Sequence, residues 1–120
     1  MRESGENYLE TILMLQKKTG CVRSVDIANQ LEYSKPSVSR AMGILKKQDY
    51  IMMDRSGFIE LTEKGAQKAA EIYERHTLIQ KFLVETLNID KDIAEQDACR
   101  IEHIISEHTF DKIRQYVERQ

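Results

Sequence analysis

The chain has 120 residues, enough for one domain or for two small ones that share a long helix, and its net charge of −2 by itself argues against a nucleic-acid binder. The composition, with no Trp, one Pro and an ordinary apolar content, excludes collagen-like, low-complexity and disordered classes. Because neither a signal-peptide core nor a run of about 18 apolar residues occurs, we expect a cytoplasmic protein without membrane contact.

The first predicted element is a helix over about residues 4–18, with Ser4 as its N-cap. Its inner face is predicted from apolar residues at helical spacing, which are Tyr8, Ile12 and Leu15. A second, short helix is predicted behind Ser24, because Ser is a good N-cap and Asp26 in the first turn suits the helix dipole.

A third helix is predicted to start near Ser34, because Pro36 is well tolerated in a first helical turn. Two short apolar runs around a Gly-containing turn, over residues 50–61, predict a β-hairpin. Thr62 can cap a long fourth helix that ends near Leu87. A fifth helix is expected over about residues 91–107, and a sixth from Phe110 to the end.

This order of elements predicts a winged helix-turn-helix, in which the third helix enters the major groove of DNA and the hairpin lies along the backbone. The charge distribution supports DNA binding, since residues 35–55 contain five basic residues and only two acidic ones. Arg40 can read base edges, and the other predicted contacts are Lys35, Ser37, Ser39, Lys47 and Arg55. The alternative, a merely solvated basic face, explains any single Lys but not the whole arrangement.

Cys99, Glu102 and His103 stand at i, i+3 and i+4 of the fifth helix, which places a thiolate, a carboxylate and an imidazole on one face. These are ligand types of transition metals. Residues 90–107 also carry six acidic residues against two basic ones, a balance that suits cations. Taken alone, the triplet is also compatible with a packed Cys beside a solvated Glu–His pair.

The segments Asp97–His103, Tyr73–His76 and Asn7–Glu10, in one chain with the winged helix, together resemble the diphtheria toxin repressor and manganese transport regulator family of metal-dependent repressors (DtxR/MntR family). The wing exit Leu61–Gly65 and the turn Ser34–Ser37 also resemble the family, and the turn adds Ser34 and Pro36 to the candidate DNA-binding residues. The resemblance covers the chain from about Gly5 to the sixth helix.

The resemblance implies a metal held by three segments of the chain. Carried over by position, the candidate ligands are Asn7, Glu10, His76, Cys99, Glu102 and His103. Cys99 matches the iron-responsive branch, Glu10 matches the manganese branch, and Asn7 departs from both. Because a soft thiolate favours Fe(II) over Mn(II), we expect activation by Fe(II) first and Mn(II) next, with Co(II) or Zn(II) as substitutes in vitro.

We therefore expect a mainly α protein with a winged helix-turn-helix DNA-binding domain at residues 1–62 and a helical dimerisation and metal-binding domain at residues 63–120. Its expected function is metal-dependent repression of metal-uptake genes, as a homodimer on a palindromic double-stranded operator. One rival is a winged-helix regulator gated by a small organic ligand, although no such ligand is expected. A remote rival is a metal hydrolase with Glu102 as general base, but no HExxH motif or nucleophile elbow supports an enzyme.

The remaining cysteine and histidine lie outside this ligand set. Cys21 and Cys99 are expected to be free thiols, since they lie in a reducing compartment. Cys21 is interpreted as a small buried apolar residue and His108 as a surface residue.

Overall fold

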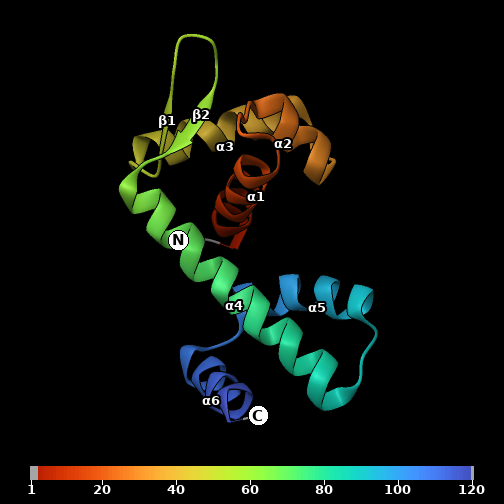
Figure 1. Ribbon diagram of the computed structural model, residues 1–120. Coiled ribbons are helices and arrows are strands. Elements are labelled where there is room, and N and C mark those ends of the chain that lie inside the picture. The colour runs from red at the N-terminus through yellow and green to blue at the C-terminus, as the bar shows by residue number, and fades with distance from the viewer. Residues whose placement is uncertain (1–2, 120) are drawn as a thin grey trace. The chain divides into compact units, whose positions relative to one another are not determined.

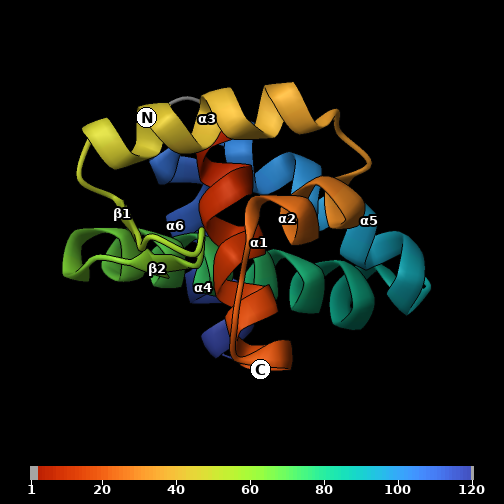
Figure 2. The ribbon, with the colours of Figure 1, turned by 90° about the horizontal axis from the view of Figure 1, so that it is seen from above.

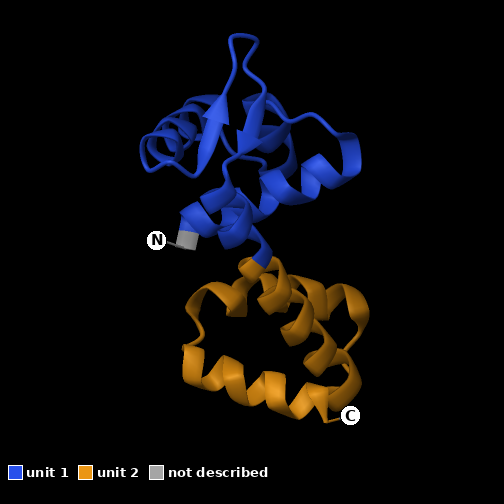
Figure 3. Ribbon diagram, turned by 60° about the vertical axis from the view of Figure 1, so that its left-hand side comes forward, with its two compact units in different colours: residues 1–70 blue, residues 71–120 orange. Residues whose placement is uncertain are grey.

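The computed structural model describes residues 3–119, and its helices and hairpin follow one another in the predicted order (Figure 1). The elements are α1 (Glu3–Thr19), α2 (Ser24–Leu31), α3 (Lys35–Lys47), β1 (Ile51–Met53), β2 (Ile59–Leu61), α4 (Glu63–Leu87), α5 (Lys91–Ile104) and α6 (Glu107–Glu118). The predicted fold class, mainly α with a winged helix-turn-helix, is confirmed. Two compact units, Met1–Ala70 and Glu71–Gln120, divide within α4 (Figure 3), and each is described by itself below.

The N-terminal unit is built around α1, which contacts α2 and β2, while α3 contacts α2 and β1 (Figure 2). Apolar side chains from each of these elements form one core. Its largest fully buried side chains are those of Leu9, Ile12, Val22, Ile27, Val38, Met42, Ile51 and Ile59. Because Val38 and Met42 lie on the inner face of α3, this helix keeps its opposite face exposed.

Two predicted helix N-caps are wrong. The N-cap of α2 is Arg23, not Ser24, and the Asp26 carboxylate accepts a hydrogen bond of 2.8 Å from the Arg23 backbone N–H. The carboxylate of the third helical residue therefore accepts a hydrogen bond from the backbone N–H of the N-cap residue. In the first helix, Ser4 lies in the first turn of α1 and not at its cap, because the helix already includes Glu3.

The cap of α3 is the predicted Ser34, whose hydroxyl accepts a 3.3 Å hydrogen bond from the Ser37 backbone N–H. The same hydroxyl donates to the Ser37 hydroxyl at 2.7 Å. Pro36 lies in the first turn, where its missing N–H costs no helical hydrogen bond. Local chemistry alone therefore explains where this helix begins.

The hairpin pairs β1 with β2 in antiparallel register, with Ile51 opposite Leu61 and Met53 opposite Ile59. One carboxylate oxygen of Asp54 accepts hydrogen bonds of 2.9 Å from the backbone N–H groups of both Ser56 and Phe58. Side-chain acceptors of this kind hold a turn in one conformation. The turn between the strands, which carries Arg55, is therefore held by its own residues.

At the start of α4, the Thr62 hydroxyl accepts a 3.0 Å hydrogen bond from the Gly65 N–H, as a helix cap does, and donates to the Asp49 carbonyl at 2.6 Å. Gly65 is buried against the backbone of Tyr50, and a Cβ at this position would overlap the Tyr50 carbonyl oxygen. The close approach requires glycine because no other residue lacks the Cβ.

The C-terminal unit consists of most of α4 together with α5 and α6. Its core contains Ile79, Leu83, Ala94, Ala98 and Phe110. Here the predicted boundary between the last two helices is wrong: α5 ends at Ile104 and α6 begins at Glu107. The cause is Ser106, whose hydroxyl caps α6 by accepting a 3.1 Å hydrogen bond from the Thr109 N–H, while Ile105 is extended.

The exposure of several side chains corrects or supports the sequence expectations. Cys21 is exposed, so its interpretation as a buried apolar residue is wrong, whereas His108 is exposed as predicted. Both cysteines are free thiols. Two isoleucines of α5, Ile93 and Ile104, are 53% and 71% exposed and therefore do not belong to the core of the C-terminal unit. Among residues 3–119, no helix is long and apolar enough to cross a membrane.

Candidate DNA-binding face and metal site

Every predicted DNA-binding residue lies at the surface of the N-terminal unit. The exposed residues are Ser34, Lys35, Pro36, Ser37, Ser39, Arg40, Lys47 and Arg55. All but Arg55 belong to α3 or its cap, and they are exposed where Val38, Met42 and Leu45 of the same helix are buried. Because the inner face of α3 packs in the core of the N-terminal unit, the exposed polar side chains of this helix can contact a ligand. Their roles in DNA binding stay predictions.

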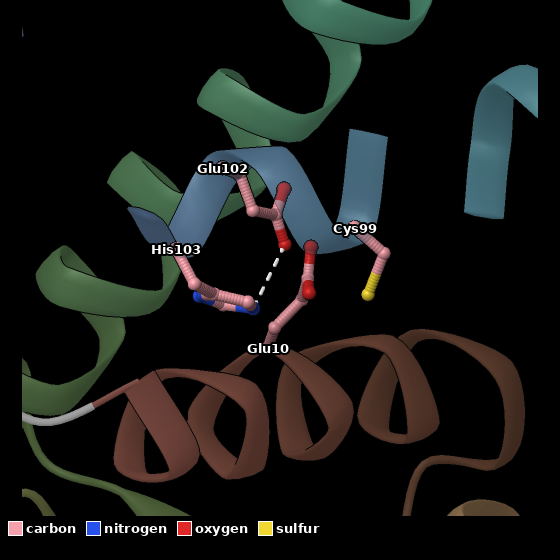
Figure 4. A group of neighbouring side chains, drawn as sticks. All are labelled: Glu10, Cys99, Glu102 and His103. Carbon is pink, nitrogen blue, oxygen red and sulfur yellow. Dashed lines mark ion pairs between the residues drawn. The ribbon is translucent and has the colours of Figure 1, made fainter. Parts of the chain in front are cut away.

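The candidate metal residues of α5 point in one direction, as the helical spacing predicts (Figure 4). The candidate ligand atoms of Cys99, Glu102 and His103 all lie within 4.8 Å of one another. Glu102 is buried, at 1% exposure, and Cys99 is half-buried. Figure 4 also draws Glu10, which comes from α1 in the N-terminal unit.

The Glu102 carboxylate lies between two imidazole rings of the same unit. One oxygen is 3.2 Å from His103 Nε2 and the other is 3.1 Å from His76 Nδ1, on α4. The exposed fractions of the three side chains are 0%, 4% and 14%, in the order Glu102, His103 and His76. Burying a carboxylate is costly unless opposite charge or hydrogen-bond donors compensate it. This local environment therefore favours a bound cation beside the Glu102 carboxylate.

The donor set fits a divalent transition metal. A thiolate, a carboxylate and two imidazoles are ligands that such ions accept, and their burial would shield a bound ion from water. Of the six predicted ligands, the structure brings together His76, Cys99, Glu102 and His103 within the C-terminal unit. Asn7 and Glu10 lie on α1, half-buried and buried respectively, and their participation stays a prediction.

Sequence reasoning missed one residue beside this cluster. Arg75, the neighbour of His76, donates a 3.0 Å hydrogen bond from Nη1 to the backbone carbonyl of Glu102. Nothing in the residue pattern distinguishes this arginine from a solvated one, because the contact depends on how α4 packs against α5.

A winged-helix unit with an exposed basic helix, joined to a helical unit that carries buried metal-ligand types, defines a class of protein: a metal-responsive DNA-binding regulator. The comparisons with known proteins agree. The family model of the iron dependent repressor N-terminal DNA binding domain matches residues 1–57, and that of the iron dependent repressor metal binding and dimerisation domain matches residues 62–119. The chain belongs to the DtxR/MntR family of metal-dependent transcriptional repressors.

Three relatives illustrate the similarity. An uncharacterized HTH-type transcriptional regulator of Methanocaldococcus jannaschii is 30% identical over 120 residues, which cover 99% of this chain and 96% of that protein. The HTH-type transcriptional regulator MntR of Shouchella clausii is 35% identical over 115 residues, covering 96% of this chain and 80% of the relative. The structure of the manganese regulator SloR matches with a TM-score of 0.82 and 28% identity, covering 95% of this chain and 53% of that one.

The chain thus spans about half the length of SloR but most of the other two relatives. The homologues are transcriptional regulators and not enzymes, so the metal-hydrolase alternative is not supported. A regulator gated by a small organic ligand is also not favoured, because both matched domains belong to metal-dependent repressors.

Proposed function

We propose that this protein represses metal-uptake genes by binding an operator when a divalent metal occupies the cluster on α4 and α5. The observation that carries the proposal is the convergence of the Cys99, Glu102 and His103 ligand atoms within 4.8 Å, in the chain that also presents the exposed face of α3. DNA binding is assigned to residues 1–62, and dimerisation and metal binding to residues 63–120; this division lies at the start of α4, whereas the compact units divide within that helix, after Ala70.

In the proposed mechanism, His76, Cys99, Glu102 and His103 would hold the cation in the C-terminal unit, and Glu10 and Asn7 would add oxygen ligands from α1. A bound divalent cation would supply positive charge beside the buried Glu102 carboxylate. Residues from both units would then bind the same metal ion, and this would restrict the separations that the two recognition helices of a homodimer can adopt. Matching them to half-sites about one helical turn apart favours a palindromic operator. The linkage is reciprocal, so DNA also tightens metal binding.

Arg40 is proposed to read bases, because it lies exposed on the outer face of α3. Arg40→Ala should weaken specific binding by about 1–3 kcal/mol, while Lys47→Ala should weaken all sequences alike and reduce the dependence of binding on salt. Both effects can be measured by fluorescence anisotropy with operator and random duplexes at several salt concentrations. A ratio of specific to random affinity that survives in Arg40→Ala would refute this role.

Fe(II) is proposed as the preferred metal, followed by Mn(II), with Co(II) or Zn(II) as substitutes in vitro. The Cys99 thiolate supports Fe(II), since soft ligands discriminate against Mn(II). The main rival is Mn(II), because SloR, whose structure is similar to this chain, is named as a manganese regulator. The proposed Glu10 and Asn7 oxygens suit Mn(II) as well, so the outcome depends on whether Cys99 binds the metal.

A titration of DNA binding against Mn(II), anaerobic Fe(II), Co(II) and Zn(II) tests both the function and the metal. We expect no specific binding in strong chelator, and half-maximal binding at a lower concentration of Fe(II) than of Mn(II). Co(II) should produce a thiolate charge-transfer band that is absent in Cys99→Ser, and Cys99→Glu should shift the response towards Mn(II). Binding that persists unchanged in chelator would contradict metal control. A lower requirement for Mn(II) and no thiolate band would instead make Cys99 a bystander.

A further inference from the structure

Arg75 joins three points of the C-terminal unit through one guanidinium group. Its Nη1 donates to the Glu102 carbonyl at 3.0 Å, and its Nη2 lies 3.9 Å from the Glu107 carboxylate. The guanidinium carbon is also 5.4 Å from the centre of the Phe110 ring, within the range of a cation–π contact. These partners belong to the last turn of α5 and the first turn of α6, so one side chain of α4 contacts both sides of the connection between them.

The carbonyl that Arg75 contacts is in a special position. Glu102 lies in the last turn of α5, which ends at Ile104, and the final carbonyls of a helix lose their amide partners within the helix. They also carry the negative end of the helix dipole, which a cation stabilises. A guanidinium group meets both needs because it is permanently charged and presents several N–H donors in a fixed plane.

Two consecutive residues of α4, Arg75 and His76, both contact Glu102. Arg75 holds the backbone of Glu102, and His76 faces its carboxylate at 3.1 Å. The next residue, His103, is another candidate ligand. Arg75 cannot be a ligand itself, because a guanidinium has no acceptor atom and does not lose its proton in proteins.

We propose that Arg75 is a positioning residue of the metal site: by holding the Glu102 carbonyl it fixes the last turn of α5, and with it the side chains of Glu102 and His103, against His76. This inference rests on the proposed metal-binding function. Partners that orient metal ligands commonly contribute about 10–100-fold to metal affinity although they never touch the ion.

The chain offers a matched control in Arg114. This arginine also links α6 to α4, with its Nη2 3.0 Å from the Glu74 carboxylate and its guanidinium carbon 5.1 Å from the centre of the Phe110 ring. Neither of these contacts involves a candidate ligand or α5. Each arginine is replaced by methionine, which keeps an unbranched apolar side chain. Arg114→Met removes contacts between α4 and α6 alone, whereas Arg75→Met also removes the contact with Glu102.

The test measures Co(II) affinity and the Co(II) absorption spectrum of the full chain, together with thermal unfolding in chelator. Arg75→Met should lower the affinity about 10–100-fold and alter the spectrum, with partial recovery in Arg75→Lys. Arg114→Met should keep both the affinity and the spectrum of the wild-type protein. Equal losses in the two methionine variants, or an unchanged Arg75→Met, would overturn the assignment.

If Arg75→Met does not fold in chelator, the comparison moves to Arg75→Lys and Arg114→Lys. A larger loss of Co(II) affinity in Arg75→Lys then supports the proposal, and an equal loss overturns it. Failure of the proposed function is a different result: the wild-type protein itself would not bind Co(II). If the wild-type protein binds Co(II) and Arg75→Met binds it with the same affinity, only the role of Arg75 is refuted.

Discussion

Glu102→Gln is expected to abolish metal-dependent DNA binding while leaving the protein folded. Gln has nearly the same shape as Glu, but it removes the negative charge that lies 3.1 and 3.2 Å from the two imidazole rings. A neutral amide is a poor substitute for a carboxylate towards a divalent cation. Because Glu102 would touch the metal directly, its loss should exceed the roughly 10–100-fold effect of a residue that only orients ligands.

The measurement is calorimetric titration with Mn(II) and Co(II), followed by operator binding at saturating metal. Glu85→Gln, the same substitution at an exposed position of α4, is the control and should bind metal and DNA as the wild-type protein does. Circular dichroism in chelator shows whether the variant is folded. A folded Glu102→Gln protein that still requires, and responds to, the same metal concentration would contradict the assignment of Glu102 as a ligand.

Gly65→Ala is expected to destabilise the N-terminal unit by about 3 kcal/mol, the upper end of the usual cost of overpacking. A Cβ at this position would overlap the Tyr50 carbonyl oxygen and lie 2.9 Å from the carbonyl carbon. That oxygen already accepts a 3.1 Å hydrogen bond from the Thr62 N–H. The Tyr50 backbone cannot move away without breaking this hydrogen bond at the junction of the hairpin and α4. The overlap therefore destabilises the folded state.

Chemical denaturation of Gly65→Ala and of a control, Gly43→Ala, checks this expectation. Gly43 provides the control, because it lies within α3 and a Cβ at that position would have no neighbour within 4 Å outside its own helix backbone. Gly43→Ala should stabilise the protein by up to about 1 kcal/mol, since Ala is the better helix former. Opposite signs for the two substitutions are thus expected. If Gly65→Ala unfolds at the same denaturant concentration as the wild-type protein, the close approach to Tyr50 does not constrain the fold.

Local sequence chemistry determined the order of elements and much of the candidate DNA-binding face. Ser34 and Pro36 define the start of α3, and Thr62 caps α4, because caps and first turns depend only on neighbouring residues. The same locality places Cys99, Glu102 and His103 on one face of α5, since helical spacing alone brings residues three and four apart together. Their predicted contacts with metal remain to be measured.

Other features were decided by tertiary structure. The exposure of Cys21 contradicts its apolar interpretation, because a residue's burial depends on what packs over it. The approach of His76 to Glu102, the Arg75 contact with the Glu102 carbonyl and the need for glycine at position 65 all join residues far apart in the sequence. No local pattern encodes them, because each distance is set only when α4 packs against α5 or against the loop before the hairpin.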